Sequence, residues 1–424
     1  MTAIKETIET NERCILVGMV RRGQSRWEVE DHLAELEDLA QTSGAEPIRT
    51  FIQERPVPDP AFFVGRGKIE EIHEFITENR IDLIIFDDEL SPAQARNIEK
   101  ITGIKVLDRT GLILDIFALH ARTNMAKVQV ELAQLNYILP RLTRQWQHLS
   151  RQVGGIGTKG PGETQLETDR RLVRRRIAHL KEKLKRISHQ NEVQRQQRSG
   201  LFRAALIGYT NVGKSTLMKA LTDAEVGIED KLFATLDTTV RRLKLSSTTT
   251  VLLSDTVGFI RKLPHHLVAS FQTTLAEAIE ADLLIHVVDV TQTNFEEQLK
   301  IVEGILRELE IDSKKRLLVF NKVDRLRNHN VLAQLKVLYP DALFISAARH
   351  IGLNHLKRKL LTLAEDRFEV STIKLDYTHG AGEHLVYPYA TIIEKTLDEH
   401  YLYLTIKYDR ANKQIIHQIL SKYR

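Results

Sequence analysis

The sequence is short of cysteine and of long apolar runs, and both shortages limit what the protein can be. Its only cysteine, Cys14, excludes a disulfide within the chain and a cysteine-rich metal site, and is typical of a reducing cytosol. The longest apolar runs resemble "ADLLIHVVDV" in length, well short of the roughly 18 residues that indicate a membrane-spanning helix. The polar start, "MTAIKETIETNER", is unlike a secretory signal peptide. We therefore expect a cytoplasmic protein without a transmembrane segment.

Charge is nearly balanced overall but not along the chain. The 424 residues include 61 lysines and arginines and 56 acidic residues, which gives a net charge of +5. Residues 141–198 alone hold fifteen basic and five acidic residues, a local charge of +10 that leaves −5 for the remainder. A basic block on an otherwise acidic protein favours a polyanionic partner such as a nucleic acid. A solvated charged helix without a partner is the alternative.

The apolar pattern predicts an α/β protein of four units, close to the roughly three domains expected for this length. Short apolar runs alternate with amphipathic stretches at the start and predict a small α/β domain. Heptad spacing from Val128 to Leu149 and from Leu166 to Ile187 predicts a long antiparallel helical hairpin, kinked at Pro140. A mostly parallel α/β domain with a β-hairpin at 240–255 follows, and a small C-terminal α/β unit ends the chain. The predicted boundaries are 1–120, 121–198, 199–366 and 367–424.

A glycine-rich run, "GGIGTKGPG", lies between the two heptad stretches. Five glycines fall within residues 153–162, although the whole chain has only 21. No Gly-Lys-Ser/Thr ends the run and no apolar strand leads into it, so the run does not fit a phosphate-binding loop. A flexible link between two antiparallel helices instead predicts an exposed tip, held away from the domains.

A phosphate-binding loop is predicted at "GYTNVGKST", residues 208–216. The stretch fits G-x-x-x-x-G-K-[ST], directly follows the apolar strand "AALI" and opens a helix, which is the context the pattern requires. Lys214 would reach the β- and γ-phosphates, and the Ser215 hydroxyl would ligate Mg²⁺. The predicted nucleotide contacts here are Gly208, Tyr209, Thr210, Asn211, Val212, Gly213, Lys214, Ser215 and Thr216.

Three further stretches, each at the end of a predicted strand, indicate that the nucleotide is GTP or GDP. An acidic residue in "DTVG" would hold Mg²⁺ through water, and Gly258 N–H would sense the γ-phosphate. Asp324 in "NKVD" would accept both guanine N1–H and the 2-amino group, and "SAA" would donate backbone N–H to guanine O6. Adenine lacks that donor pair and would be rejected by roughly 10⁴-fold. These predicted contacts are Asp255, Thr256, Val257, Gly258, Asn321, Lys322, Val323, Asp324, Ser346, Ala347 and Ala348.

The segment "LFATLDTT", residues 232–239, is the predicted switch I. Thr235 is the preferred second Mg²⁺ ligand over Thr238 and Thr239, since Thr239 adjoins a predicted strand. Lys214, Thr235 and Gly258 are the predicted catalytic residues. The predicted nucleotide contacts of this segment are Phe233, Ala234, Thr235, Leu236 and Asp237.

Phe259 follows "DTVG" at the position where many GTPases carry a glutamine that orients water. A phenylalanine cannot do this by hydrogen bonding, so hydrolysis by the protein alone should be slow. It should need a partner, water positioned from elsewhere, or a bound cation. Asn211 is similar to the asparagine of potassium-activated GTPases, but an ordinary loop residue is an equal alternative.

Four strings together resemble the HflX family of GTPases: "FFVGRGKIEEI", "GGIGTKGPGETQLETDRR", "LFATLD" and "DTVGFIRKLPHHLV". The resemblance covers most of the chain, although Thr238 stands where the family usually has proline and the last 55 or so residues match loosely. It implies a monomeric protein that binds the large ribosomal subunit or whole ribosomes, including ribosomal proteins. It also implies that the GTP-bound form splits or rescues stalled ribosomes, with a further role in subunit biogenesis.

The resemblance also implies that the hairpin probes ribosomal RNA. Thin glycine backbone would enter RNA clefts while basic side chains neutralise phosphates; a passive linker is the alternative. Two other functions stay open, a signalling or scaffold GTPase with a protein partner and an RNA-remodelling ATPase using the N-terminal domain. In that domain, "GRGK" (65–68) is too short for a phosphate loop and is predicted to cap a helix. The predicted RNA contacts are Gly154, Gly155, Gly157, Lys159, Gly160, Gly162, Arg170, Arg171, Arg174, Arg175 and Arg176.

Overall fold

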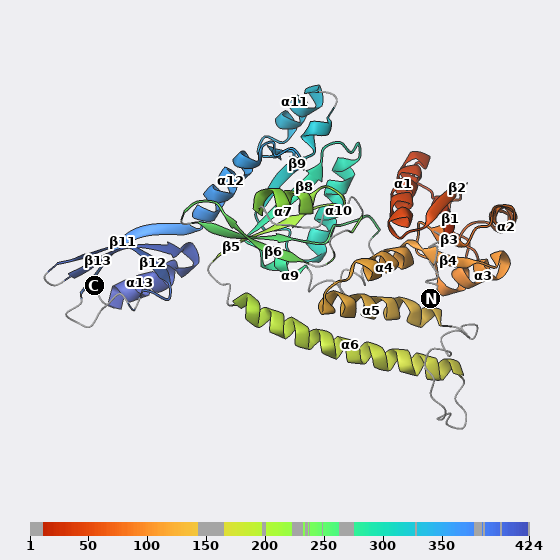
Figure 1. Ribbon diagram of the computed structural model, residues 1–424, viewed down its shortest axis with the longest axis horizontal. Coiled ribbons are helices and arrows are strands. Elements are labelled where there is room, and N and C mark those ends of the chain that lie inside the picture. The colour runs from red at the N-terminus through yellow and green to blue at the C-terminus, as the bar shows by residue number, and fades with distance from the viewer. Residues whose placement is uncertain are drawn as a thin grey trace, which may run out of the picture.

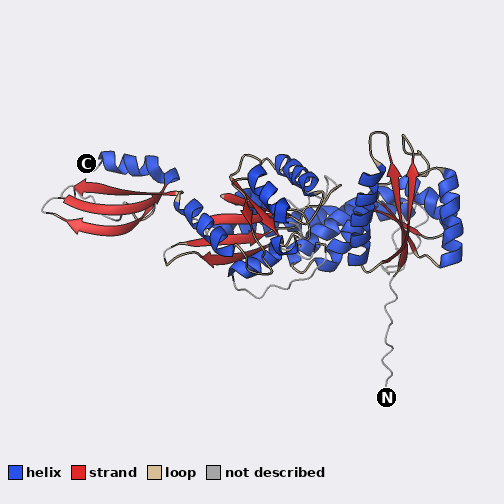
Figure 2. Cartoon of the chain, turned by 90° about the horizontal axis from the view of Figure 1, so that it is seen from above, coloured by secondary structure: helices blue, strands red, loops and turns tan. Residues whose placement is uncertain are grey.

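The computed structural model describes residues 12–142, 165–196, 201–222, 232–233, 236, 238–247, 249–262, 275–326, 329–376, 384, 386–398 and 401–422. These residues form an N-terminal α/β domain, a helical hairpin, a central α/β domain and a small C-terminal unit, which confirms the predicted fold class (Figure 1). The N-terminal domain and the C-terminal unit lie at opposite ends of the molecule (Figure 2). Among the described helices, none is both long and apolar enough to cross a membrane. The exact domain boundaries stay predictions.

The N-terminal domain is a four-stranded parallel sheet with helices on both faces. Its strand order is β2-β1-β3-β4. Alternate side chains of a strand point to opposite faces, so Cys14 and Leu16 of β1 join one apolar cluster, and Ile15 and Val17 join the other. The strands are β1 (Arg13–Val20), β2 (Glu46–Glu54), β3 (Leu83–Phe86) and β4 (Lys105–Asp108), and the helices are α1 (Arg26–Thr42), α2 (Arg66–Asn79), α3 (Pro92–Thr102) and α4 (Arg109–His120).

Local sequence sets where these helices begin. Ser25 before α1 and Ser91 before α3 each form a capping box, in which the serine and the residue three positions later satisfy each other's backbone N–H. Gly65 is the N-cap of α2, so "GRGK" begins a helix as predicted.

The hairpin packs along the predicted apolar seam. Val128 and Leu132 of α5 (Asn124–Ile138) are buried against Ile177 and Leu180 of α6 (Gln165–Gln196). Figure 1 shows the two helices side by side. Residues 143–149, over which the heptad pattern predicts that the helix continues, lie outside the described residues, and the helix is interrupted at Ile138, close to the predicted kink at Pro140. α5 stops there and a 3-10 turn (Leu139–Arg141) follows, because a proline cannot donate the hydrogen bond that continues a helix. The glycine-rich tip lies outside the described residues.

The central domain is a six-stranded sheet in the order β10-β9-β8-β5-β7-β6. Only β6 and β7 pair antiparallel, which confirms the predicted β-hairpin. Since parallel strands end at the same edge of the sheet, β5, β8 and β9 bring their following loops together there. The strands are β5 (Phe202–Ile207), β6 (Thr239–Lys244), β7 (Thr250–Asp255), β8 (Leu283–Asp289), β9 (Arg316–Asn321) and β10 (Leu343–Phe344). The helices are α7 (Lys214–Thr222), α9 (Ala276–Glu280), α10 (Phe295–Glu308), η3 (Val323–Arg325), α11 (His329–Leu338) and α12 (Leu353–Glu365).

The C-terminal unit is an antiparallel sheet of order β11-β13-β12 with one helix. Its strands are β11 (Phe368–Asp376), β12 (Ala390–Leu397) and β13 (Tyr401–Asp409), followed by η6 (Arg410–Asn412) and α13 (Lys413–Lys422). Arg367, just before β11, pairs with Asp282 of the central domain at 2.8 Å and also with Asp409. The unit is therefore joined to the central domain by an ion pair as well as by the chain.

Candidate nucleotide-binding site

Two glycines let the chain turn tightly after β5. Gly208 and Gly213 have φ values of +144° and +92°, which residues with side chains rarely adopt. A Cβ at Gly208 would lie 2.2 Å from the carbonyl oxygen of Val287, and one at Gly213 would lie 2.4 Å from Nδ2 of Asn321. The loop leads into the N-terminus of α7, which favours an anion. This geometry suits a phosphate.

Lys214 and Ser215, the first residues of α7, contact the chain's own polar groups. The buried Nζ of Lys214 donates to the carbonyl oxygens of Gly208 and Tyr209 at 3.1 and 2.7 Å. Burial lowers the pKa of Lys214 to about 8, because a charged ammonium is less stable away from water. The Ser215 hydroxyl donates to Oδ2 of Asp255 at 2.6 Å, so the oxygen groups predicted to hold Mg²⁺, one directly and one through water, are neighbours.

The oxygen donors of Ser215 and Asp255 fit Mg²⁺. This ion usually takes one or two protein ligands and completes its shell with water and phosphate oxygens. Within the described residues, no cluster of three or more Asp, Glu, His or Cys side chains could hold a metal. Protein side chains of these residues alone would therefore not complete the coordination shell of the ion.

The "DTVG" segment lies directly against the phosphate loop. Thr210 N–H donates to the Phe259 carbonyl at 2.8 Å, and Phe259 N–H donates to the Gly208 carbonyl at 3.1 Å. A Cβ on Gly258 would lie 2.9 Å from Cα of Thr210 and 3.0 Å from Nζ of Lys214. Gly258 is therefore beside the groups that would surround a terminal phosphate.

Phe259 points into the domain and not toward the phosphate loop. Its ring is buried in an apolar cluster with Ala205, Ile207 and Leu275. The segment that begins at "DTVG" is the switch II of a GTPase. This packing gives a reason for a large apolar residue after "DTVG", since the side chain anchors switch II to the core. The side chain is thus placed away from any attacking water.

Switch I contacts the N-terminal domain. Phe233 is buried, has a φ of +55°, and packs edge-on against Phe117 of α4 with ring centroids 4.7 Å apart. Leu236 is also buried. Ala234, Thr235 and Asp237 lie outside the described residues, so Thr235 as a metal ligand stays a prediction.

The predicted residues of "NKVD" and "SAA" line one cavity of about 630 Å³, except Val323, which packs against an apolar cluster instead. The Asn321 side chain connects the phosphate loop to the "SAA" segment. Its Nδ2 donates to the Val212 carbonyl at 2.9 Å, and its Oδ1 accepts from Ala347 N–H at 2.9 Å. Lys322 donates to the Asn211 carbonyl at 2.8 Å. The lining residues are Asn211, Gly213, Thr216, Asn321, Lys322, Asp324, Arg325, Ser346, Ala347, Ala348 and Arg349.

Three residues of this cavity region were not predicted from the sequence. Arg325 and Arg349 line it and directly follow "NKVD" and "SAA", so extending each stretch by one residue would have found them. Asp289, at the end of β8, pairs with Lys322 at 2.7 Å. Its only signal was its place at a strand end.

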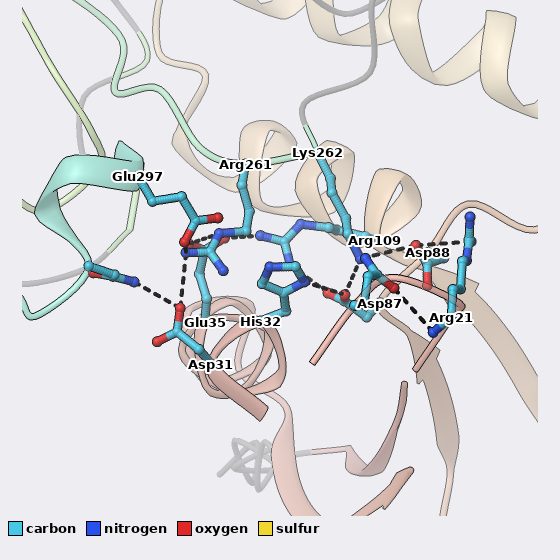
Figure 3. A network of polar contacts seen from close by, with 12 residues as sticks. Arg21, Asp31, His32, Glu35, Asp87, Asp88, Arg109, Arg261, Lys262 and Glu297 are labelled. Carbon is cyan, nitrogen blue, oxygen red and sulfur yellow. Dashed lines mark hydrogen bonds and ion pairs between the residues drawn. The ribbon is translucent and has the colours of Figure 1, made fainter. Parts of the chain in front are cut away.

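An ion-pair network joins switch II to the N-terminal domain (Figure 3). Lys262 pairs with Asp87 and, at 3.0 Å, with Asp88, both just after β3. Arg261, almost fully buried, lies 3.0 Å from Asp31 of α1 and 3.6 Å from Glu297 of α10. Arg261 and Lys262 are therefore both paired with carboxylates of the N-terminal domain, and Arg261 also with Glu297 of its own domain.

Arg109 lies at the centre of this network. Its buried guanidinium pairs with Asp87 at 2.7 Å and with Glu35. Glu35 also contacts the hydroxyl of Tyr209, which accepts a hydrogen bond from Arg261 N–H at 2.8 Å. The phosphate loop, switch II and the N-terminal domain thus share one set of buried charges. His32, beside them, stays neutral because burial lowers its pKa to about 4.

The basic face of α6 is only partly available to a partner. Arg170, Arg171, Arg174 and Arg175 line a surface hollow of about 550 Å³. Arg176 instead forms two hydrogen bonds to Glu131 of α5, at 2.7 and 3.1 Å, and so joins the two helices. The glycines of the tip and Lys159 lie outside the described residues.

Comparisons with known proteins match this architecture. Residues 30–118 match the family model "GTP-binding GTPase N-terminal", 120–198 match "GTP-binding GTPase Middle Region", and 203–322 match "50S ribosome-binding GTPase". The chain is 49% identical over 377 residues to a GTPase HflX of Flavobacterium psychrophilum, covering 84% of this chain and 91% of that one. It is 42% identical over 372 residues to the GTPase HflX of Escherichia coli K12, covering 87% of each. A GTP-binding protein from Sulfolobus solfataricus, solved with GDP, is 26% identical, with a TM-score of 0.43 over 84% of this chain and 99% of that one.

Asp324→Asn tests the guanine site. The amide places a donor against the guanine donors, so we expect GTP affinity to fall by about 100-fold or more. Titration calorimetry with GTP and ATP measures this. Asp341→Asn, an exposed change in the same domain, is the matched control. Unchanged GTP affinity, or equal competition by ATP in the parent, would contradict the assignment.

The lowered pKa of Lys214 predicts pH-dependent nucleotide binding. Phosphate favours the charged lysine, so binding takes up a proton once the free lysine has lost it. Affinity for GDP should be constant below the free pKa of about 8 and weaken above it, approaching tenfold per pH unit. Calorimetry between about pH 6.5 and 9, with Lys214→Arg as a variant that stays charged, checks the slope. A flat profile for the parent would rule out this role of the lysine proton.

Arg109→Met tests the buried network. The change leaves two carboxylates without their arginine, and breaking a buried ion pair typically costs about 3–5 kcal/mol. We expect faster amide hydrogen exchange in β3 and α4, measured by mass spectrometry. Arg186→Met removes an exposed arginine from α6 and should change nothing in those peptides. Equal exchange in both variants would show that Arg109 contributes little.

Proposed function

The chain belongs to the HflX family of GTPases and hydrolyses GTP, and from this we propose that it is a cytoplasmic switch that acts on ribosomes. In its GTP-bound form it would bind the large subunit or whole ribosomes as a monomer and promote the splitting or rescue of stalled ones. The match of residues 203–322 to a 50S ribosome-binding GTPase model supports a ribosomal partner. The observation that carries the proposal is the contact of both switches with the N-terminal domain.

We propose that this contact passes the nucleotide state to the rest of the molecule. To bind a γ-phosphate, Gly258 must present its N–H to the phosphate, while Phe259 is hydrogen-bonded to the phosphate loop. Any shift of Gly258 moves Lys262, four residues on, which pairs with Asp87 and Asp88. Switch I adds a second contact through Phe233 and Phe117. The N-terminal domain would then reorient with the nucleotide, and the hairpin with it.

Mg²⁺ is proposed to bind beside the phosphates through Ser215 and Thr235, with Asp255 acting through water. The ion would neutralise charge on the phosphate oxygens, while Lys214 stabilises charge on the transferring group. Because Phe259 is buried, the water must be oriented by another group, and a ribosome or a K⁺ ion near Asn211 are the candidates. We therefore expect the protein alone to hydrolyse GTP slowly.

We propose that the basic face of α6 and the glycine-rich tip contact ribosomal RNA. Arg170, Arg171, Arg174 and Arg175 lie along one side of the helix near the tip and would neutralise phosphates. Arg176 would act indirectly, by holding α6 against α5 through Glu131.

Reversing charge on α6 tests the ribosomal role. Arg174→Glu with Arg175→Glu should weaken co-sedimentation with large subunits under a GTP analogue and lower the salt slope by about one unit per lost phosphate contact. Single-turnover GTP hydrolysis should lose its stimulation by large subunits but keep its basal rate. Arg358→Glu with Lys359→Glu, the same charge change on exposed positions of α12, is the control. If neither parent nor variant binds ribosomes, or the parent's rate is the same with and without them, the proposal fails.

A further inference from the structure

One face of the C-terminal sheet is left uncovered by the described residues. On the other face, Leu402, Leu404, Ile406 and Tyr408 of β13 are buried in a cluster that includes Ile416 of α13. Figure 2 shows the helix along one side of the three strands. Side chains alternate along a strand, so the residues between these four project from the opposite face. They are Tyr401, Tyr403, Thr405 and Lys407, and all are partly exposed.

Aromatic residues are concentrated in this unit. Seven of the chain's ten tyrosines follow residue 367, although the unit is only 58 of 424 residues (367–424). Most of these tyrosines are not needed for the apolar core of the unit, since Tyr408 is the only tyrosine in that core among the described residues.

The open face combines aromatic rings with lysines. Lys374 lies directly opposite Tyr403 in the sheet, and its Nζ is 3.5 Å from the ring centre of Tyr401 and 5.8 Å from that of Tyr403. Lys407 is 4.9 Å from the ring centre of Phe368, at the other end of the face. A lysine therefore lies close to the aromatic rings at each end of this face.

We propose that this face binds single-stranded RNA, with bases stacked on Tyr401, Tyr403 and Phe368. Tyr401 and Tyr403 are two residues apart on one strand, about 6.8 Å, roughly twice the 3.4 Å spacing of stacked bases. Successive bases of an extended strand can thus stack on the two rings. Lys374 and Lys407 leave the rings and pair with the phosphates, which flexible lysine chains do readily.

Charge favours RNA over a basic partner. Lys374 and Lys407 lie on this face, and Asp409 at its edge is already paired with Arg367. Glu394, opposite Thr405, is the one acidic side chain in the middle of the face among the described residues. Exposed threonines at 372, 391 and 396 offer hydroxyl groups to the sugar and bases, and the exposed Val370, opposite Lys407, adds an apolar contact. The inference concerns a surface separate from both the nucleotide site and the basic face of α6.

The test uses the full chain and a fluorescein-labelled oligouridine of 12 nucleotides. Arg174→Glu with Arg175→Glu is introduced into every protein, to remove the electrostatic contribution of α6. In this background, Tyr401→Ser with Tyr403→Ser should weaken binding at least tenfold by fluorescence anisotropy, since each stacked base contributes substantially. The salt slope should be unchanged, because no charge is lost. Tyr387→Ser with Tyr389→Ser, exposed in the turn before β12, should bind like the background protein.

A second measurement guards against misfolding of the double variant. Photo-crosslinking of the unmutated protein to a 4-thiouridine oligonucleotide should yield labelled peptides from β11 and β13. Affinity within twofold of the background, or crosslinks confined to other parts of the chain, overturns the proposal. Sedimentation with ribosomes is measured separately on Tyr401→Ser with Tyr403→Ser made in the chain that keeps Arg174 and Arg175. If the tyrosine change leaves oligonucleotide binding normal but abolishes this sedimentation, the face docks on a ribosomal protein, and the RNA assignment is wrong.

Discussion

The buried guanidinium of Arg109 is the interaction on which the arrangement of domains depends. A charge with almost no solvent contact must be neutralised nearby, and Asp87 and Glu35 do this. Both carboxylates also contact the central domain, through Lys262 and the Tyr209 hydroxyl. Asp87 and Glu35 of the N-terminal domain therefore neutralise the buried Arg109 and also position Lys262 and Tyr209 beside the nucleotide site. Neither domain presents this surface to water in the arrangement described.

Several polar groups at the nucleotide site form hydrogen bonds within the chain. Lys214 donates to two carbonyls of the phosphate loop, and Ser215 donates to Asp255. A nucleotide with its metal must replace these hydrogen bonds, while the glycines and Asn321 keep the surrounding backbone in place. The phosphate and base pockets are thus formed beforehand, and only a few side chains need to change partners when the nucleotide enters.

Much of this could be predicted from the sequence because it depends on short segments. The motifs "GYTNVGKST", "NKVD" and "SAA" each follow a strand, and their residue types determine the local backbone geometry. Parallel strands then bring these strand ends together at one edge of the sheet. The heptad seam likewise predicted which faces of α5 and α6 meet. The burial of Phe259, the pairing of Arg176 with Glu131 and the contact of Arg261 with Asp31 could not be predicted. Each depends on which segments approach one another in three dimensions, and Arg261 follows Asp31 by 230 positions, more than half of the 424-residue chain.

The length of α6 gives the molecule mechanical leverage. Its 32 residues span about 48 Å at 1.5 Å per residue, and five residues separate its C-terminal end from β5 in the sequence. A rotation of about 10° at that end would sweep the far end of the helix through roughly 8 Å, given the length set by the helical rise. A rotation of this size would therefore displace the far end of α6 by more than the roughly 3.4 Å between stacked bases.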